Sequence, residues 1–530
     1  MPEPANLVAS TPPARPDEPA DWRQAPPDLE ALAPMHIVGR YRHARRCIDP
    51  PCLDLTPVPA ASDYEVLIAP MDGVWSVSRL RGSRPRIDLQ PIWRELPLGP
   101  LQVTVRAWNS DGRLVGLGPL AILRRSPDWD GRQDAALDYR ATGCGVIEYL
   151  VRHAPEASDH PGMPGYLWHA AAAVAGRRVA HDFQFPALSY PSLIDLFVTG
   201  AASGCGDELG EDLLARARSL ADFLLDHPAV TDGPLAGAPR STMDQQGGGG
   251  MHEPDRITLV RLGWTGCAML RLAEATGDAR YATYGERLGQ MLLDTQQADG
   301  SWPYRVRLSD GAVLEPYTAA VSIALLLLER LDAGVPNGPY AAAIDRGLEW
   351  VIANPVRTGL WQQMYEDVPT LEPYENLEQW AALETAMLLI RRRHPNALSL
   401  ARTLVRYVED QFVLFGDEAV LSTPYLPFTP CVLEQYRCYW PMDFHTANYA
   451  RAVLALHEAT GEPEWAWKAI AAANTIVHCR QPDGRLSTLV PDQRFGVAPP
   501  FSDWFNCMAH AADVLLRLGP TLTELGTIRE

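Results

Sequence analysis

Long hydrophobic runs are absent from this chain of 530 residues. The longest one, from Ile323 to Leu328, is far shorter than the roughly 20 apolar residues that a transmembrane helix needs. Near the N-terminus no basic segment precedes an apolar one, so the pattern of a secretory signal is missing. The sequence therefore predicts a cytoplasmic protein without a membrane partner.

Paired cysteines and clustered basic residues are scarce as well. The nine cysteines are scattered and form no CxxC pair, which favours reduced thiols in the core over a disulfide framework. Acidic residues outnumber basic ones by 65 to 46, and the net charge is −19 at pH 7. Nucleic acids and anionic membranes bind clustered Lys and Arg, so neither is expected as a partner. An anionic small substrate is still compatible with this charge, because a few arginines in one cleft suffice to hold it.

Several catalytic and ligand-binding motifs are also missing. The sequence contains no HExxH, no CxxC and no DxDxDG segment, so a zinc site or an EF-hand calcium site has no support. It contains no GxSxG elbow, no P-loop and no convincing GxGxxG. We therefore expect neither a metal nor a cofactor.

A helical hairpin that occurs twice dominates what is present. The first copy runs from Leu270 to Trp302 and the second from Leu454 to Leu486, and every matched residue is offset by 184. In both copies an apolar helix ends at E-A-T-G-(D/E), a second helix begins at once, and Q-x-D-G closes it. Repeated helix pairs build a solenoid or a closed ring. Asp299 and Asp483 occupy the equivalent Q-x-D-G turns, so we interpret both as turn formers.

The sequence pattern changes twice along the chain and predicts three regions. Residues 1–34 have the Pro-rich, acidic composition of a flexible tail. Residues 35–126 contain alternating segments such as YEVLIA and LQVTVRAW, which predict strands, with a hairpin turn at Asn109–Gly112. These strands predict a small β-sandwich that resembles a fibronectin type III module. Residues 127–530 form the third region, which is mainly helical.

Helical periodicity in the third region predicts twelve helices, or six hairpins. They lie near residues 133–153, 188–202, 209–226, 257–276, 279–296, 315–332, 340–352, 376–392, 396–413, 444–460, 463–479 and 502–518. At the usual pitch of about 60 residues per hairpin, the offset of 184 places the two copies three hairpins apart. They then face each other across a ring, so the predicted fold is an (α/α)6 toroid.

Short and long links alternate between the predicted helices. Alternate connections leave a ring of helices on opposite faces, so the long loops share one face, where function is expected. Their aromatic and charged side chains suit sugar rings, which need flat apolar faces and planar hydrogen-bonding groups. The candidate substrate-binding residues are His252, Arg256, Trp302, Tyr304, Arg305, Trp361, Tyr374, Asn376 and Trp440.

These residues also have structural interpretations. Trp302 and Trp361 are equally compatible with loop anchors that are buried against the rim of the ring. Asp443 and His445 stand at a helix start, where Asp443 is compatible with an ordinary N-cap. Glu375 and Glu378 flank another helix start, where acidic residues interact favourably with the helix dipole in any case.

Helical hairpins that close with T-G-D and Q-x-D-G, long aromatic loops on one face and an N-terminal β-module together resemble the six-hairpin glycosidase superfamily of toroidal carbohydrate-active enzymes. The resemblance spans about residues 128–518. It implies, first, a glycoside hydrolase of the inverting kind, in which one carboxylic acid protonates the leaving oxygen and a carboxylate activates water. The pair would be Asp443 and Glu375, with Glu366 and Asp367 as reserves.

The resemblance also implies a second class, a uronate lyase or epimerase. There Tyr439 and His445 would transfer the proton next to a carboxylate, which Arg256, Arg305 and Asn376 would neutralise. A non-catalytic glycan-binding protein is the third alternative. In each case the expected partner is an oligosaccharide, either neutral or uronate-containing, and the oligomeric state is left open.

Overall fold

The protein is described here from a computed structural model. The described residues are 32–35, 37, 45–47, 50–71, 77–125, 129–131, 134–153, 164, 186–241, 255–334, 338–365, 370–371, 373, 376–415, 428–435, 438–490 and 504–527. The chain divides into two compact units. One comprises residues 1–130 with 407–418, and the other comprises residues 131–406 with 419–530.

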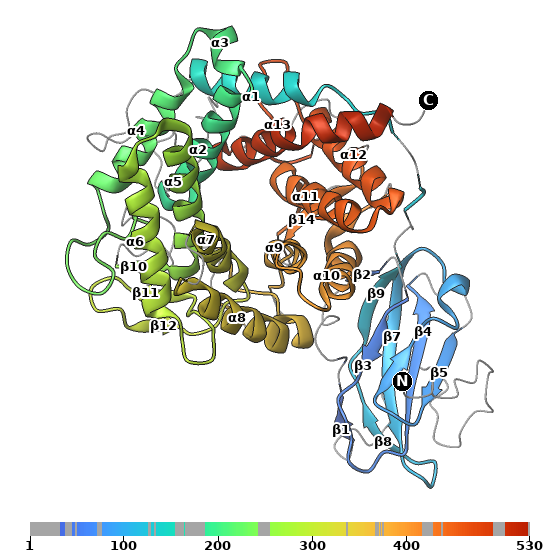
Figure 1. Cartoon of the computed structure of the whole chain (residues 1–530). Coiled ribbons are helices and arrows are strands. Elements are labelled where there is room, and N and C mark those ends of the chain that lie inside the picture. The colour runs from blue at the N-terminus through green and yellow to red at the C-terminus, as the bar shows by residue number, and fades with distance from the viewer. Residues whose placement is uncertain are drawn as a thin grey trace, which may run out of the picture. The chain divides into compact units, whose positions relative to one another are not determined.

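Six helices of the second unit form an inner ring (Figure 1). They are α2 (Pro186–Ala202), α5 (Leu262–Thr276), α7 (Val321–Gly334), α9 (Trp380–Arg391), α11 (Asp443–Thr460) and α13 (Phe505–Thr527). Each inner helix packs on the next in this order, and α13 packs on α2, so the ring is closed.

A second set of helices lies outside the first (Figure 1). It consists of α1 (Tyr139–His153), α4 (Leu213–Asp226), α6 (Ala279–Thr295), α8 (Tyr340–Val351), α10 (Ala397–Phe412) and α12 (Pro463–His478). The short helix α3 (Cys205–Leu209) precedes α4. All twelve predicted helices are present, and the (α/α)6 toroid is confirmed. None of the described helices combines the length and the apolar character that a membrane span needs.

The repeated hairpin is built in the same way in both copies. Thr276 and Thr460 each donate a hydrogen bond to the carbonyl four residues earlier, at 2.7 Å. The glycine that follows each threonine adopts a left-handed conformation and ends the helix, with φ of 73° and 70°. Asp299 and Asp483 accept backbone N–H groups within their turns, as predicted for turn formers. Helices α5 and α11 lie three steps apart in the ring of six, which confirms that the copies face each other.

Small sheets in the long connections were not predicted. In the first, β10 (Arg256–Thr258) pairs with β11 (Arg305–Arg307), which pairs with β12 (Val313–Glu315). Consequently α5 begins at Leu262 and not at the predicted residue 257. In the second, β14 (Cys431–Gln435) and β15 (Cys438–Met442) form an antiparallel hairpin directly before α11. Residues that the hydrophobic periodicity assigns to the first turn of α5 thus form a strand instead, which pairs with the distant strand β11.

The first unit contains the predicted strands. A seven-stranded sheet comprises β1 (Ala33–Pro34), β2 (Arg45–Cys47), β4 (Asp63–Pro70), β5 (Ser78–Gly82), β7 (Gly99–Trp108), β8 (Leu114–Leu117) and β9 (Ala121–Arg125). A two-stranded sheet comprises β3 (Cys52–Asp54) and β6 (Arg86–Asp88). Buried residues of both sheets, among them Leu53 and Val66, share one hydrophobic core. The likeness to a fibronectin type III module stays a prediction.

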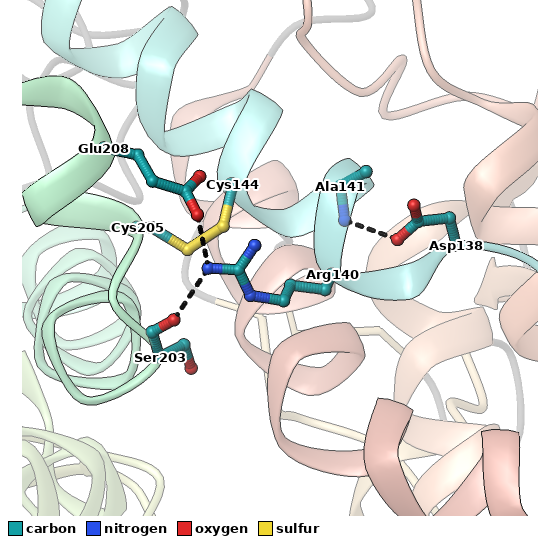
Figure 2. The surroundings of a disulfide bond; sticks show 7 residues. All are labelled: Asp138, Arg140, Ala141, Cys144, Ser203, Cys205 and Glu208. Carbon is teal, nitrogen blue, oxygen red and sulfur yellow. Dashed lines mark hydrogen bonds and ion pairs between the residues drawn. A yellow bond between two sulfur atoms is a disulfide. The ribbon is translucent and has the colours of Figure 1, made fainter.

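A disulfide joins Cys144 on α1 to Cys205 on α3, with the two Cα atoms 5.4 Å apart (Figure 2). Beside it, Arg140 donates to Glu208 at 2.8 Å and to the Ser203 carbonyl at 3.0 Å. The prediction that the cysteines are reduced thiols is therefore wrong for this pair. Sequence spacing did not predict this bond, because 61 residues separate the two cysteines in the chain.

Candidate active site at the long-loop rim

Buried polar residues gather where the long connections enter the inner helices α5, α9 and α11. We define this region, the long-loop rim, by Arg261, Glu378, Gln379, Asp443 and His445. Arg261 directly precedes α5, Glu378 and Gln379 precede α9, and the other two begin α11. All five are at most 2% exposed, which is unusual for side chains of these types. Burial of so many polar groups at one end of a ring marks it as a candidate functional site.

Glu378 is the most informative residue of the rim. Its Oε2 atom accepts the Ala381 N–H at 3.1 Å, and its own backbone N–H donates to the Trp361 carbonyl at 2.7 Å. Burial raises the pKa of Glu378 to about 7, although two backbone N–H groups and the positive charge of Arg261 act in the opposite direction. The capping contact holds the carboxyl in one place. Glu378 is therefore a fixed group that exchanges a proton near neutral pH.

His445 lies beside Gln379, the residue that follows Glu378 in the chain. The side-chain amide of Gln379 contacts Nδ1 of His445, so the starts of α9 and α11 are joined. The imidazole lies among the rings of Phe444, Trp380 and Tyr365, with ring centres 5.1, 6.3 and 6.0 Å away. Burial lowers the pKa of His445 to about 3. The imidazole is thus neutral at physiological pH, with one ring nitrogen as a donor and the other as an acceptor.

Asp443 is fully buried at the start of α11. Its Oδ1 atom accepts the Phe444 N–H at 2.6 Å, and its backbone N–H donates to the Thr488 carbonyl at 2.9 Å. Burial raises the pKa of Asp443 well above its usual value. Its carboxyl also helps to raise the pKa of Cys479, which follows the last residue of α12. Asp443 is the first residue of α11 and Met442 is the N-cap, so the interpretation of Asp443 as an ordinary N-cap is wrong. Its catalytic role stays a prediction.

The predicted aromatic platforms are buried. Trp302 is fully buried and donates its indole N–H to the Leu292 carbonyl at 2.8 Å, and Trp361 is 1% exposed. Tyr304 donates its hydroxyl to the Tyr365 carbonyl. Arg305 stacks 4.4 Å above the Tyr304 ring and pairs with a glutamate on β12. Burial of the two tryptophans favours the loop-anchor interpretation over sugar stacking.

The structure brings some predicted residues together. Asn376 and Tyr304 line one small pocket together with Tyr365. Asn376 donates from Nδ2 to Oε1 of Gln435 at 2.6 Å, while its buried Oδ1 accepts no hydrogen bond from any described residue. Arg256, on β10, is partly exposed and lies on the strand next to Arg305. Among the described residues, the pocket thus brings together two of the nine predicted binding residues, Tyr304 and Asn376.

Other predicted residues lie outside the described part of the chain. They are His252, Glu366, Asp367, Tyr374 and Glu375. Tyr439 and Trp440 belong to β15, but only their backbone is described. Their assigned roles stay predictions.

Three rim residues, Glu378, Gln379 and Arg261, are not among the site residues that the sequence predicts. The sequence pattern indicates for Glu378 only an acid at a helix start. The segment N-L-E-Q-W carries polar residues directly before a strongly apolar helix, which is the only local signal for their burial. That signal is weak, because the same pattern is typical of an exposed helix cap.

Comparison with known proteins identifies the fold. No protein-family model matches the chain, and no curated protein is similar to it in sequence. A solved D-mannose isomerase is similar in structure, with a TM-score of 0.54 and 11% identity over 72% of this chain and 97% of that one. A sugar epimerase from a ruminal bacterium has a TM-score of 0.51 and 10% identity over 73% of this chain and 99% of that one.

A family 76 glycoside hydrolase from a bovine Bacteroides thetaiotaomicron strain aligns over 92% of this chain and 99% of its own, with 10% identity and a TM-score of 0.49. At such identities these likenesses concern the fold and not the reaction. The isomerase and the epimerase thus show that the helical fold is shared with known proteins, and the resemblance to the six-hairpin glycosidase superfamily stays a prediction.

Proposed function

We propose that this chain is an enzyme that acts on carbohydrates by acid–base chemistry at the long-loop rim. The observation that carries the proposal is Glu378, a fully buried carboxyl whose pKa is raised to about 7. An acid or base is most effective when its pKa lies near the working pH. The fold, shared with proteins described as a sugar epimerase and a D-mannose isomerase, supports a sugar as the substrate.

Proton transfer on the sugar carbon chain, as in an isomerase or epimerase, is the reaction that the described residues support best. It needs one base and one neutral hydrogen-bonding group on the sugar oxygens. Ionised Glu378 supplies the base, and neutral His445, positioned by Gln379, supplies the second group. The Arg261 guanidinium, whose charge acts on Glu378, would stabilise negative charge that develops on an oxygen. Glu378 thus takes the place of Tyr439 in the predicted proton transfer.

Glycoside hydrolysis is the second candidate, and one observation favours it. Glu378 and Asp443 are both buried carboxyls with raised pKa values at the starts of inner helices. Protonated Glu378 would deliver a proton to the leaving oxygen, as a general acid must. The reaction also needs a carboxylate that activates water. Asp443 supplies it only if its carboxyl, which contacts the α11 backbone, reaches the substrate.

One experiment separates these reactions. Mono- and oligosaccharides, neutral and uronate-containing, are incubated with the protein in D2O. NMR then follows deuterium at the sugar carbons while reducing ends and ultraviolet absorbance are measured on the same samples. Deuterium without new reducing ends supports proton transfer, and absorbance with uronates identifies the lyase variant. New reducing ends without deuterium support hydrolysis. Binding without any product would leave the glycan-binding alternative and overturn the enzymatic proposal.

A further inference from the structure

A cavity of about 360 Å³ lies inside the toroid, and residues of all six inner helices line it. We call it the central cavity. Its volume falls within the range of small-molecule sites, which is roughly 300–1,000 Å³. None of the five residues that define the long-loop rim lines it. It therefore needs an explanation of its own.

An aromatic layer closes the central cavity toward the rim. Trp380 stacks on Phe444 with ring centres 4.5 Å apart, Trp264 packs edge-on against Trp380 at 5.5 Å, and His510 lies 4.6 Å from Phe444. The two tryptophans and Phe444 stand in the first turns of their helices, at the rim end. His445 contacts this layer through Trp380 and Phe444 but does not itself line the cavity.

The cavity opens at the opposite end, where the short connections leave the inner helices. Glu384, in the second turn of α9, is 1% exposed, whereas Arg391, the last residue of that helix, is 40% exposed. Arg330 and Arg517, farther along α7 and α13, are 31% and 39% exposed. Exposure thus rises toward the C-terminal ends of the helices, away from the site that the sequence predicts.

Arginines dominate the lining of the cavity. Five of them, Arg271, Arg330, Arg391, Arg451 and Arg517, line it together with the acidic residues Asp195, Glu329 and Glu384. Arg330 and Arg517 pair with two further acids, Glu274 and Asp513, so each of the five guanidinium groups has a carboxylate partner. Anion binding there depends on the N–H donors that these pairs leave over, not on a net positive charge.

The arginines also form ion pairs between neighbouring inner helices. In each pair an arginine reaches an acid on the preceding helix. The pairs are Arg271 with Asp195 at 2.7 Å, Arg330 with Glu274 at 2.6 Å, Arg391 with Glu329 at 2.9 Å, and Arg451 with Glu384 at 2.7 Å. Such a belt stabilises the ring, which is its structural role. A guanidinium has five N–H donors, however, and one carboxylate leaves some of them for a further acceptor.

One buried oxygen atom in the cavity has no hydrogen-bond donor among the described residues. Glu384 binds Arg451 through Oε1, while its buried Oε2 accepts no hydrogen bond. A buried carboxylate oxygen left without a donor is costly, and a ligand hydroxyl would satisfy it. The ligand should therefore carry hydroxyl groups as well as negative charge. Apolar carbons of the same molecule would rest on the aromatic layer formed around Trp380.

We propose that the central cavity is a second ligand site, which binds a compact sugar phosphate through the short-connection end of the toroid. The phosphate meets the guanidinium groups at the mouth, whose planar geometry matches its oxygens. A sugar hydroxyl donates to Glu384. The site is separate from the long-loop rim, so the proposal does not rest on the reaction assigned there.

Isothermal titration calorimetry tests this with three probes, namely glucose 6-phosphate, inorganic phosphate and glucose. We expect glucose 6-phosphate to bind more tightly than inorganic phosphate, glucose not to bind in the cavity, and added salt to weaken binding of both anions. Glucose binding as tightly as glucose 6-phosphate, or no anion binding at low salt, would overturn the proposal. Binding of inorganic phosphate alone would overturn the sugar component as well.

Variants locate the binding site. Arg330→Gln should weaken glucose 6-phosphate binding by about tenfold, because one charge-assisted contact is lost. Glu274→Gln breaks the same ion pair but leaves the cation, and Glu274 is 68% exposed, so this control should bind at least as tightly as the parent. Ala333→Trp, at an exposed lining position, should block the mouth, whereas Ala333→Ser should not. Equal weakening by both ion-pair variants, or undiminished binding in Ala333→Trp, would mean that the anion binds elsewhere.

Discussion

The amide of Gln379 contacts Nδ1 of His445 and so joins the start of α9 to the start of α11. Neither side chain is more than 1% exposed. The contact fixes the imidazole ring, and burial keeps it uncharged. A neutral, immobile histidine can exchange hydrogen bonds with sugar oxygens without first losing a proton.

The neutral state of His445 gives a first prediction. Because its pKa is lowered to about 3 in the folded protein, its imidazole signals should not titrate between pH 8 and pH 5 in NMR spectra. The unfolded chain takes up the proton below about pH 6.5, so stability is lost as the pH falls below that value, by roughly 2 kcal/mol at pH 5. His445→Gln should remove this part of the acid destabilisation, and the exposed His227→Gln should not. A His445 signal that titrates near pH 6.5 would contradict the burial that we describe.

Trp302 provides a second prediction, on the loop-anchor interpretation. Trp302→Phe removes the N–H that donates to the Leu292 carbonyl and leaves a small void. We expect the free energy of unfolding to fall by roughly 1–3 kcal/mol, with an unchanged KM for the saccharide substrate. Thermal melting and steady-state kinetics on the same preparation measure both quantities. A raised KM with unchanged stability would instead restore Trp302 as a substrate-binding residue.

The disulfide provides a third prediction. Its two cysteines are separated by 61 residues in the chain, and closing such a loop in the unfolded state stabilises the fold by up to about 4 kcal/mol. A reducing agent should therefore lower the melting temperature of the parent but not that of a variant with Cys144→Ala and Cys205→Ala. Thiol titration of the denatured, unreduced protein should find two fewer thiols than the nine cysteines. Nine titratable thiols would contradict the bond.

The disulfide also bears on the cell compartment. Disulfides persist mainly in oxidising environments, whereas a cytoplasmic location is what the N-terminal sequence predicts. The location stays a proposal, and the thiol titration, carried out on protein alkylated in intact cells, would test it.

Most of the scaffold was predictable from local patterns. The E-A-T-G-(D/E) and Q-x-D-G segments repeat because both of these hairpins use the same left-handed glycines and the same side-chain turn, and the constant offset of 184 at the usual hairpin pitch then predicts a ring. The face that carries the long loops was predictable from the alternation of short and long links along the chain. Sheet pairing across the loops was not, because the partners of Arg256–Thr258 lie about 50 residues away and share no pattern with them.

The individual site residues were harder to predict than the face that carries them. A glutamate directly before an apolar helix is typical of an exposed helix cap, and no local pattern marks Glu378 as buried. Burial of Glu378 depends on Trp361 and Arg261, which come from other loops. The ion pairs between the inner helices, and the central cavity that they line, could not be predicted from local patterns either. The paired residues lie 56 to 76 positions apart in the sequence.

The measurement that tests the account most directly is a pH–rate profile of the parent, Glu378→Gln and Asp443→Asn with the sugar substrate that the D2O experiment identifies. Because the raised pKa of Glu378 makes its ionised form unfavourable in the folded state, its contribution to stability is lost as the pH rises toward 7. Glu378→Gln should thus be no less stable than the parent at pH 8, so lost activity cannot be attributed to unfolding. We predict an inflection near pH 7 in the parent, a loss of at least about 100-fold in Glu378→Gln, and a smaller loss in Asp443→Asn. Near-parental activity of Glu378→Gln, with the inflection retained, would contradict the assignment of the active site to Glu378.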